Sequence, residues 1–140
     1  MHLLVTGFEP FKDSAWNPSA EIATRLRDED WAPARVSTIV LPVVTGRAAD
    51  LLLETFDRAK PDVVVMLGEA AGRRRVQVEE VAVNRRRFSL PDNDGRLVED
   101  DVVVEDGPRA HFATLPTVSL VEHLRALELP VEISGSAGTF

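Results

Sequence analysis

Residues 63–84 read VVVMLGEAAGRRRVQVEEVAVN, and the rest of the chain is organised around them. The first five residues are the most apolar run in the chain and predict a buried strand, which ends at a glycine-flanked loop over residues 68–72. The chain then returns to an extended pattern that places two carboxylates, Glu79 and Glu80, among valines. A carboxylate among apolar side chains costs free energy to desolvate unless it has a partner, so this pair is the first candidate for chemistry.

The two-residue period of a strand indicates which face of the strand each glutamate occupies. Alternate residues share a face, so Val78 lies with Glu80 whereas Val81 lies with Glu79. The apolar set therefore changes face at the glutamates. Either a bulge interrupts the strand there or both faces are buried, and in both cases one glutamate points inward. A solvated glutamate pair on an edge strand explains the pattern equally well.

Apolar runs predict three strands in the first half of the chain, at residues 3–5, 36–44 and 62–67. The first run ends at Thr6-Gly7 and opens into a loop over residues 7–13 with two phenylalanines around a proline. A helix is predicted after each of the first two strands. This alternation implies right-handed crossovers and a mostly parallel sheet.

The two helices have recognisable starts. Asn17-Pro18 has the form of an N-cap followed by proline at the first helical position, and Thr45 can cap the second helix. Their apolar stripes are predicted at Ile22, Ala23 and Leu26 in the first helix, and at Ala48, Ala49, Leu52, Phe56 and Ala59 in the second.

The expected fold is α/β, a three-layer αβα arrangement with a mostly parallel twisted sheet in a single domain over residues 1–140. Sites in such folds form beyond the carboxyl ends of the strands, where the loops 7–13 and 68–75 lie. After Asn84, a strong turn signal occupies residues 91–95, and residues 97–105 predict short strands on the edge of the domain. A helix over residues 118–127 and a strand over 131–134 complete the pattern.

Composition limits the function classes. The 140 residues are 44% hydrophobic and 28% charged, which is typical of one globular domain. The net charge of −7 argues against nucleic acid, and no apolar run is long enough for a membrane span. The cytoplasm is the expected location. With no cysteine, the chain has no disulfide, no thiolate metal site and no thiol nucleophile, and its three scattered histidines do not indicate a metal site.

Basic residues cluster at positions 73–75 and 85–87, on either side of the glutamate strand. Such runs are most often solvated faces. They are also possible partners for the acidic stretch Glu99-Asp100-Asp101, or part of a subunit contact.

The last residues are unusual for an α/β protein. A predicted strand leads into the small-residue loop 135–140, and the chain stops where a helix normally follows. We therefore expect this chain to be a fragment or an early-terminated product that lacks its C-terminal portion.

Three separated stretches together resemble the pyroglutamyl peptidase I family of cysteine peptidases, also called pyrrolidone carboxyl peptidases. They are residues 6–11 (TGFEPF) with Asn17-Pro18, residues 68–84, and residues 134–140 (SGSAGTF). Segments 41–44, 91–95 and 114–116 also look like family segments in the right order. The similarity covers essentially the whole chain.

The resemblance implies removal of N-terminal pyroglutamate from small peptides by a Cys-His-Glu arrangement without a cofactor. The family pattern Glu-basic-aliphatic-Ala-x-Asn maps onto residues 79–84, which makes Glu79 the catalytic acid. The family's cysteine comes two residues beyond the segment that matches 136–140, and its histidine comes later still. None of His2, His111 and His123 can therefore take the histidine's role.

The resemblance also implies which residues hold the substrate ring. Phe8 and Phe11 from the first loop and Phe140 near the nucleophile contact it, with Leu90 and Glu69 nearby. Without the family, these phenylalanines are better interpreted as core residues.

This chain departs from the family at several positions. Lys12-Asp13 replaces two glycines, so the first loop is not assured of the same backbone path. Glu69 stands where an amide or apolar residue is common, and Glu80 where a basic residue is. Ser89 replaces an arginine near the catalytic centre, a loss that weakens electrostatic stabilisation.

Two other function classes remain open. One is a catalytically inactive truncated homologue that acts as an interaction module through an exposed apolar face. The weaker one is a nucleotide-binding module, which is disfavoured because neither glycine loop has the G-x-G-x-x-G fingerprint. A homo-oligomer is expected for the peptidase.

Overall fold

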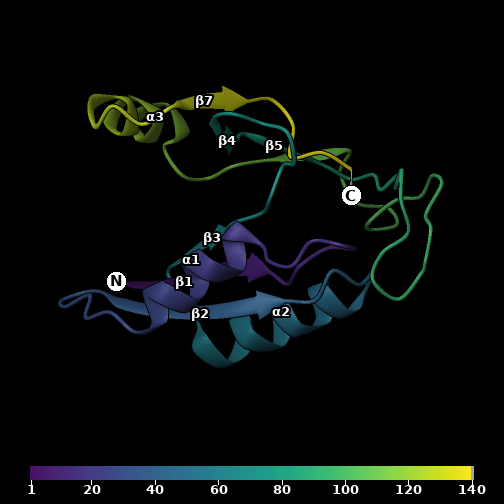
Figure 1. Ribbon diagram of the computed structural model, residues 1–140, viewed down its shortest axis with the longest axis horizontal. Coiled ribbons are helices and arrows are strands. Elements are labelled where there is room, and N and C mark those ends of the chain that lie inside the picture. Colours follow the sequence, from purple (N-terminus) through teal and green to yellow (C-terminus); the bar gives the residue numbers. More distant parts are fainter. Residues whose placement is uncertain (140) are drawn as a thin grey trace. The chain divides into compact units, whose positions relative to one another are not determined.

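The computed structural model describes residues 1–139 (Figure 1). It divides into two compact units. Unit 1 comprises Met1–Ala70 with Pro91–Arg96, and unit 2 comprises Ala71–Leu90 with Leu97–Phe140. Both units are of the α/β kind and their strands are mostly parallel, as the order of predicted elements implies.

Unit 1 is built on a parallel sheet of three strands in the order β2-β1-β3. The strands are β1 His2–Phe8, β2 Arg35–Leu41 and β3 Val63–Met66. The chain crosses from β1 to β2 through α1 (Pro18–Arg27), and then back past β1 to β3 through α2 (Arg47–Ala59). Right-handed crossovers in opposite directions place the two helices on opposite faces, and Figure 1 draws α1 above this sheet and α2 below it.

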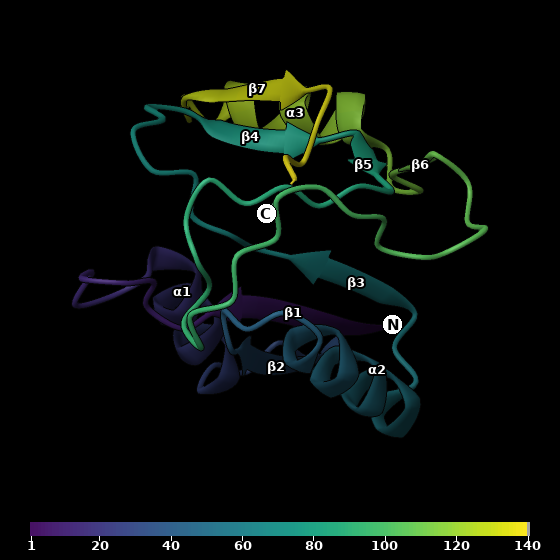
Figure 2. The same cartoon turned by 90° about the vertical axis from the view of Figure 1, so that its right-hand side faces the viewer.

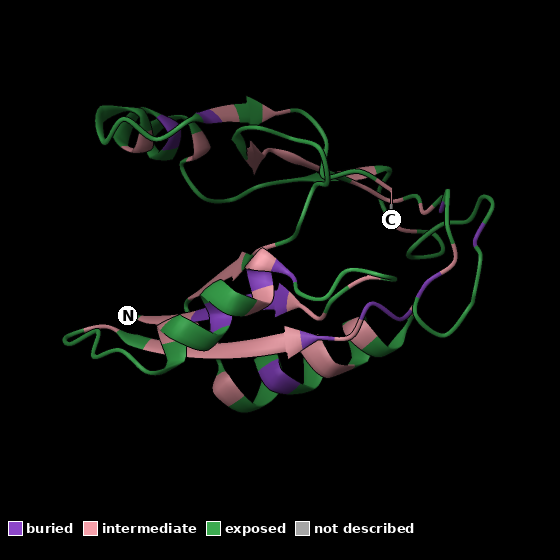
Figure 3. Cartoon of the chain, viewed as in Figure 1, coloured by how far each residue is buried: buried purple, intermediate pink, exposed green. Residues whose placement is uncertain are grey.

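The core of unit 1 lies on the central strand β1, which Figure 3 colours as largely buried. Leu4 and Thr6 are fully inaccessible, because a central strand with a helix over each face is covered on both sides. Gly7 lies against α1 so closely that a Cβ there would be 2.2 Å from the Ser19 carbonyl oxygen. The close approach of α1 to β1 therefore depends on glycine.

The predicted strand ends in unit 1 are partly wrong. β1 does not stop at Thr6-Gly7 but continues through Phe8, because Gly7 and Phe8 pair with Val40 and Leu41 of β2. The loop after β1 therefore begins at Glu9. The second strand ends at Leu41 rather than at residue 44.

The start of α1 is as predicted, and part of its apolar stripe is wrong. Asn17 is the N-cap, and its Oδ1 accepts a hydrogen bond from the Ser19 N–H at 2.9 Å. Ala23 is fully buried, but Ile22 is exposed. The inward face passes through Ser19 and Ala23, one turn apart, which rotates Ile22 toward solvent.

The predicted cap of α2 is also wrong. Its N-cap is Gly46, which has no side chain to cap the helix, and the Thr45 hydroxyl is bonded to Asp92. The inward face includes Thr55, so Ala49 and Phe56 are exposed. The remaining members of the predicted stripe are half-buried, namely Ala48, Leu52 and Ala59.

Among its described residues, unit 2 has two strand pairs and one helix. Strands β4 (Val76–Glu79) and β7 (Val131–Ser134) are parallel, whereas β5 (Val81–Val83) and β6 (Ala110–Phe112) are antiparallel. Figure 2 shows β4 beside β7 with α3 (Thr117–Ala126) against the pair. Val121 of α3 and Val131 of β7 are the most deeply buried apolar residues of this unit.

The predicted interruption at the glutamate pair is present. Glu80 separates β4 from β5, and the chain changes partner there. The Glu80 N–H donates to the Ser134 carbonyl at 2.9 Å, while the Glu80 carbonyl accepts from the Ala113 N–H at 2.8 Å. The valines therefore change face because β4 and β5 belong to different pairs.

The prediction of short strands over residues 97–105 is wrong. This segment forms turns with one isolated bridge between Arg86 and Asp101. Asn84 accounts for the difference: its Oδ1 accepts from the N–H groups of Val103 and Val104, and its Nδ2 donates to the Val104 carbonyl. One side chain thus supplies the hydrogen bonds that a neighbouring strand would have made.

Two further differences concern the last third of the chain. Strand β6 is not among the predicted elements, because three residues are too few to give a strand period. Helix α3 begins at Thr117, and of its predicted apolar stripe Leu120 and Leu127 are exposed while Val121 is buried. Among residues 1–139, no helix is long and apolar enough to cross a lipid bilayer.

Candidate functional site

Glu79 is the last residue of β4, opposite Ser134 of β7 in the parallel register. Its Oε2 is buried and has no hydrogen-bond partner among the described residues. A buried acceptor without a donor costs on the order of 1–3 kcal/mol, so such an atom calls for an explanation, and a catalytic role is one of them. One of the two glutamates thus turns an oxygen inward, as the strand pattern predicts.

Glu80 has a different environment. Its Oε1 accepts a hydrogen bond from the Thr117 hydroxyl at 2.8 Å, at the start of α3. Both glutamates are half-buried, so the alternative of a fully solvated pair is wrong. The structure therefore separates the two carboxylates into one that holds α3 and one with a free, buried oxygen.

The end of the chain lies along the segment that follows Glu79. Within unit 2, the Ala137 N–H donates to the Val81 carbonyl at 2.9 Å. The Arg87 N–H donates to the Thr139 carbonyl at 2.8 Å, and the Thr139 hydroxyl donates to the Arg87 carbonyl at 3.1 Å. These bonds fix residues 137–139 beside residues 81–87. Phe140, a predicted substrate contact, lies outside the described residues.

A hollow of about 920 Å³ opens beside this C-terminal loop in unit 2. Its wall combines hydroxyls with two arginines and two aspartates, and Glu79 does not line it. The lining residues are Val83, Asn84, Arg85, Asp100, Asp101, Val102, Arg109, Ser136 and Thr139.

The arginines of run 85–87 pair with the acidic stretch, and the Arg85 and Arg87 side chains are also more than half exposed. Arg85 makes two hydrogen bonds to the Asp100 carboxylate, and Arg86 makes two to Asp101, from Nε at 3.1 Å and Nη2 at 2.7 Å. The hydrogen bonds and the charge attraction between the two groups lower the pKa of Asp100 and raise the pKa of Arg85. The acidic stretch is therefore the partner of this run, one of the alternatives that the sequence leaves open.

In unit 1, Phe8 at the end of β1 and Phe11 in the loop that follows are both half-buried, which does not fit the core interpretation. The Phe8 N–H donates to the Ser19 hydroxyl at 2.9 Å, which ties the end of β1 to α1. The Lys12 ammonium lies 5.7 Å from the centroid of the Phe11 ring. Lys12 has φ 55°, the left-handed conformation that favours glycine, so the loop keeps a glycine-like backbone at this position without a glycine.

Glu9 and Asn93 brace this loop. Glu9 Oε1 accepts from the Val43 N–H at 3.1 Å and from Asn93 Nδ2 at 3.0 Å. Asn93 Nδ2 also donates to the Pro10 carbonyl at 3.0 Å. The turn at residues 91–95 therefore holds the loop after β1, although more than 80 residues separate them in the sequence.

Asp92 attaches that turn to Thr45, the residue before the N-cap of α2. Its buried carboxylate accepts from the Thr45 N–H and the Thr45 hydroxyl, both at 2.8 Å, and from the N–H groups of Asp94 and Arg96. Hydrogen bonding, above all from the Thr45 backbone, lowers the pKa of Asp92 to about 2. The sequence signals only a turn here, and an Asp followed by Asn-Asp-Gly was the available sign of an Asx turn.

Two other predicted substrate contacts are exposed. Glu69 follows β3 in unit 1, and Leu90 in unit 2 is 45% exposed. The predicted site residues are thus distributed as Phe8, Phe11 and Glu69 in unit 1 and Glu79 and Leu90 in unit 2.

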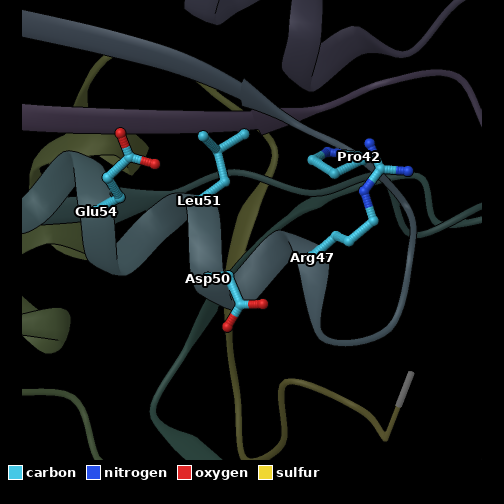
Figure 4. Close-up of a pocket in the computed structure, with 5 residues that line it drawn as sticks. All are labelled: Pro42, Arg47, Asp50, Leu51 and Glu54. Atoms are coloured by element: carbon cyan, nitrogen blue, oxygen red, sulfur yellow. The ribbon is translucent and has the colours of Figure 1, made fainter.

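A second hollow, of about 280 Å³, lies beside the first turns of α2 in unit 1. Pro42, Arg47, Asp50, Leu51 and Glu54 line it, and none of these belongs to the predicted site. In Figure 4, Leu51 and Glu54 project from one side of α2 and Asp50 from another, so the side chains do not converge on one point. The described residues also contain no group of three His, Asp or Glu side chains placed to hold a metal ion.

The fold defines the class of protein: an α/β fold in which an aromatic loop follows β1 of unit 1, and a buried carboxylate oxygen without a donor lies at the end of β4 in unit 2. The chain belongs to the pyroglutamyl peptidase family, since the family model of that description matches residues 1–140.

Individual relatives agree with this assignment. The pyrrolidone-carboxylate peptidase of Chromobacterium violaceum is 46% identical over 138 residues, which are 99% of this chain and 66% of the relative. That of Pyrococcus furiosus is 40% identical over 140 residues, which are 100% of this chain and 67% of the relative. The chain thus spans about two thirds of the length of these relatives.

Solved structures are also similar to this chain. The crystal structures of the pyrrolidone carboxyl peptidase from P. furiosus and its cysteine-free mutant include a chain that matches with a TM-score of 0.97 at 40% identity. The match covers 100% of this chain and 67% of that chain.

Proposed function

We propose that this chain carries the substrate loop and the carboxylate of a cysteine peptidase that removes N-terminal pyroglutamate from peptides. One observation carries the proposal: in a member of the pyroglutamyl peptidase family, the Glu79 Oε2 is buried and lacks a donor. An imidazole N–H is a donor that such an oxygen can accept.

The proposed chemistry needs three groups. A thiol attacks as the thiolate, an imidazole takes the thiol proton and later delivers it to the leaving amine, and a carboxylate orients the imidazole and stabilises its charged form. Glu79 supplies the carboxylate. The thiol must come from outside these 140 residues, because they contain no cysteine.

The proposed binding site for the pyroglutamyl ring comprises Phe8 and Phe11, with Phe140, Leu90 and Glu69. Partial exposure of Phe8 and Phe11 supports this role, since fully packed rings could not receive a ligand. The ring is small and mostly apolar with an amide edge, which suits aromatic side chains and a few polar groups. No cofactor is proposed.

The experiment compares two proteins in the hydrolysis of a pyroglutamyl amide. One is the 140-residue chain, with its mass verified. The other is the completed chain, in which residues 1–140 are followed by the part of the C. violaceum relative that lies beyond the matched region. We expect turnover in the completed chain only, and its loss after treatment with a thiol-blocking reagent. A completed chain that folds but has no turnover, while the C. violaceum enzyme is active in the same assay, would contradict the proposal.

A second candidate is an inactive homologue that acts as an interaction module. Three consecutive exposed valines favour it, since Val102, Val103 and Val104 are 47%, 54% and 58% exposed. A homo-oligomer is proposed on the same grounds, and sedimentation velocity at several concentrations tests it. The cytoplasmic location stays a prediction that cell fractionation checks.

A further inference from the structure

Every polar atom of the Asn93 side chain has a hydrogen-bond partner in the loop that follows β1. Its Nδ2 donates to Glu9 Oε1 and to the Pro10 carbonyl, both at 3.0 Å. Its Oδ1 accepts from the Lys12 N–H at 3.3 Å. One amide therefore contacts three of the four residues from 9 to 12, on both sides of Phe11.

The backbone of Asn93 is held as firmly as its side chain. Its N–H donates to the Val43 carbonyl at 2.9 Å, and the Val43 N–H donates back to Glu9 Oε1 at 3.1 Å. Loop 9–12, residue 43 and residue 93 thus form a closed set of bonds. Asp92 holds this set in place through its bonds to Thr45 and to the turn.

The loop needs this support because its own conformation is costly. Lys12 has φ 55°, which a residue with a side chain adopts only when surrounding contacts enforce it. The Lys12 N–H is bonded to Asn93, so the brace acts directly on the strained residue. No other side-chain type offers two donors and one acceptor in the same length as asparagine.

We propose that Asn93 is a positioning residue for the substrate ring: it holds loop 9–12, which carries Phe11 and directly follows Phe8, in the conformation that binds pyroglutamate. The inference rests on the proposed function, since it requires that this loop contacts the substrate. Asn93 acts through the loop and does not itself touch the reacting atoms.

The proposal predicts a particular kinetic signature. Phenylalanine rings against the pyroglutamyl ring contact the ground state and the transition state alike. Interactions that are equal in the two states affect KM and leave kcat unchanged. Loss of the brace should therefore weaken substrate binding without slowing the chemical step.

The experiment uses Asn93→Ala in the completed chain, with Asp94→Ala as the matched control. Asp94 is the next residue, and its exposed side chain makes only a 3.6 Å ion pair with Arg47. For Asn93→Ala we expect KM for a pyroglutamyl amide to rise about tenfold, the inhibition constant of free pyroglutamate to rise equally, and kcat to stay within about twofold. Amide hydrogen exchange at Val43 and Lys12 should become faster. The control should leave KM, the inhibition constant, kcat and the amide exchange rates unchanged.

A second variant keeps the test valid if Asn93→Ala does not fold. Asn93→Asp retains an acceptor for the Lys12 N–H, loses both donors and adds a carboxylate against that of Glu9. It should raise KM at neutral pH at least as much as Asn93→Ala.

If amide exchange at Val43 becomes faster but KM stays at the wild-type value, the brace exists without a role in binding and the proposal is wrong. A fall in kcat with unchanged KM would overturn it too. If the wild-type completed chain itself has no turnover, the proposed function fails first, which distinguishes the two failures.

Discussion

Glu79 and Ser134 lie opposite each other in register at the carboxyl ends of the parallel strands β4 and β7. Beyond this pair the two strands continue differently: Glu80 bonds to the Ser134 carbonyl, and the loop after Ser134 runs beside residues 81–87. The Glu79 carboxylate therefore lies at the end of β4, close in sequence to the segment that receives the chain's last residues. Its buried Oε2 is left without a donor.

A buried carboxylate oxygen without a donor, such as Glu79 Oε2, should lower the free energy of unfolding. In the 140-residue chain, we expect Glu79→Met to raise the free energy of unfolding by about 1 kcal/mol, because it removes a buried oxygen without a partner. Glu80→Met should lower it by about 1 kcal/mol, because the Thr117 hydroxyl loses its acceptor. Urea denaturation measures both. Equal destabilisation by the two substitutions would show that Glu79 is satisfied in solution.

Asp92 should make stability depend on pH in the acid range. Its pKa is lowered to about 2, so its contribution is fully present above the unfolded-state value near 3.8 and is lost as the pH falls toward 2. Asp92→Asn should therefore be less stable than the wild type at pH 7, and the difference should shrink between about pH 4 and pH 2. Denaturation at several pH values checks this. Asp94→Asn serves as the control, and a difference independent of pH would contradict the assignment.

Gly7 should be irreplaceable on steric grounds. A Cβ at this position would lie 2.2 Å from the Ser19 carbonyl oxygen, 2.5 Å from its carbon and 2.8 Å from the Ala20 nitrogen, all of them backbone atoms. We expect Gly7→Ala to lower the free energy of unfolding by about 3 kcal/mol or more, since α1 must move away from β1. Gly68→Ala is the matched control, because a Cβ there meets nothing within 4 Å. Thermal denaturation followed by circular dichroism compares the two.

Arg86 should contribute more than Arg85 to the stability of unit 2. The Arg86 side chain is 26% exposed and its backbone also bridges to Asp101, whereas the Arg85 side chain is 53% exposed. We expect Arg86→Met to cost about 1 kcal/mol and Arg85→Met to cost less, with 0.5 M salt reducing both effects. A larger loss of unfolding free energy from Arg85→Met than from Arg86→Met, measured by chemical denaturation, would contradict this prediction. It would show that exposure does not determine the strength of these ion pairs.

Local patterns predicted the elements of this chain better than their ends. Asn17 and Pro18 start α1 as expected, because the cap and the first turn are contiguous in sequence. The interruption at the glutamate pair was also visible, since the valines change face there. The end of β1 at Phe8 is not visible in the local sequence, because it depends on pairing with β2, more than 30 residues away.

The groups that organise the loops were not predictable from the sequence. Asp92 bonds to Thr45 and Asn93 bonds to Glu9, across 47 and 84 residues. A local turn pattern in the sequence does not predict hydrogen-bond partners at such separations. The run Val102-Val103-Val104 has the composition of a strand, yet Asn84 satisfies its backbone, and a side chain that acts in place of a strand leaves no periodic pattern. The catalytic role of Glu79 stays a prediction.

The most direct test is the turnover number of the completed chain with Glu79→Gln beside Glu80→Gln. If Glu79 orients the imidazole, Glu79→Gln should lower kcat for a pyroglutamyl amide by a factor of about 10³ to 10⁴, because the amide cannot stabilise the imidazolium. Glu80→Gln, which keeps an oxygen for the Thr117 hydroxyl, should leave kcat within about threefold. A Glu79→Gln protein with wild-type kcat, or a larger loss from Glu80→Gln, would contradict the account.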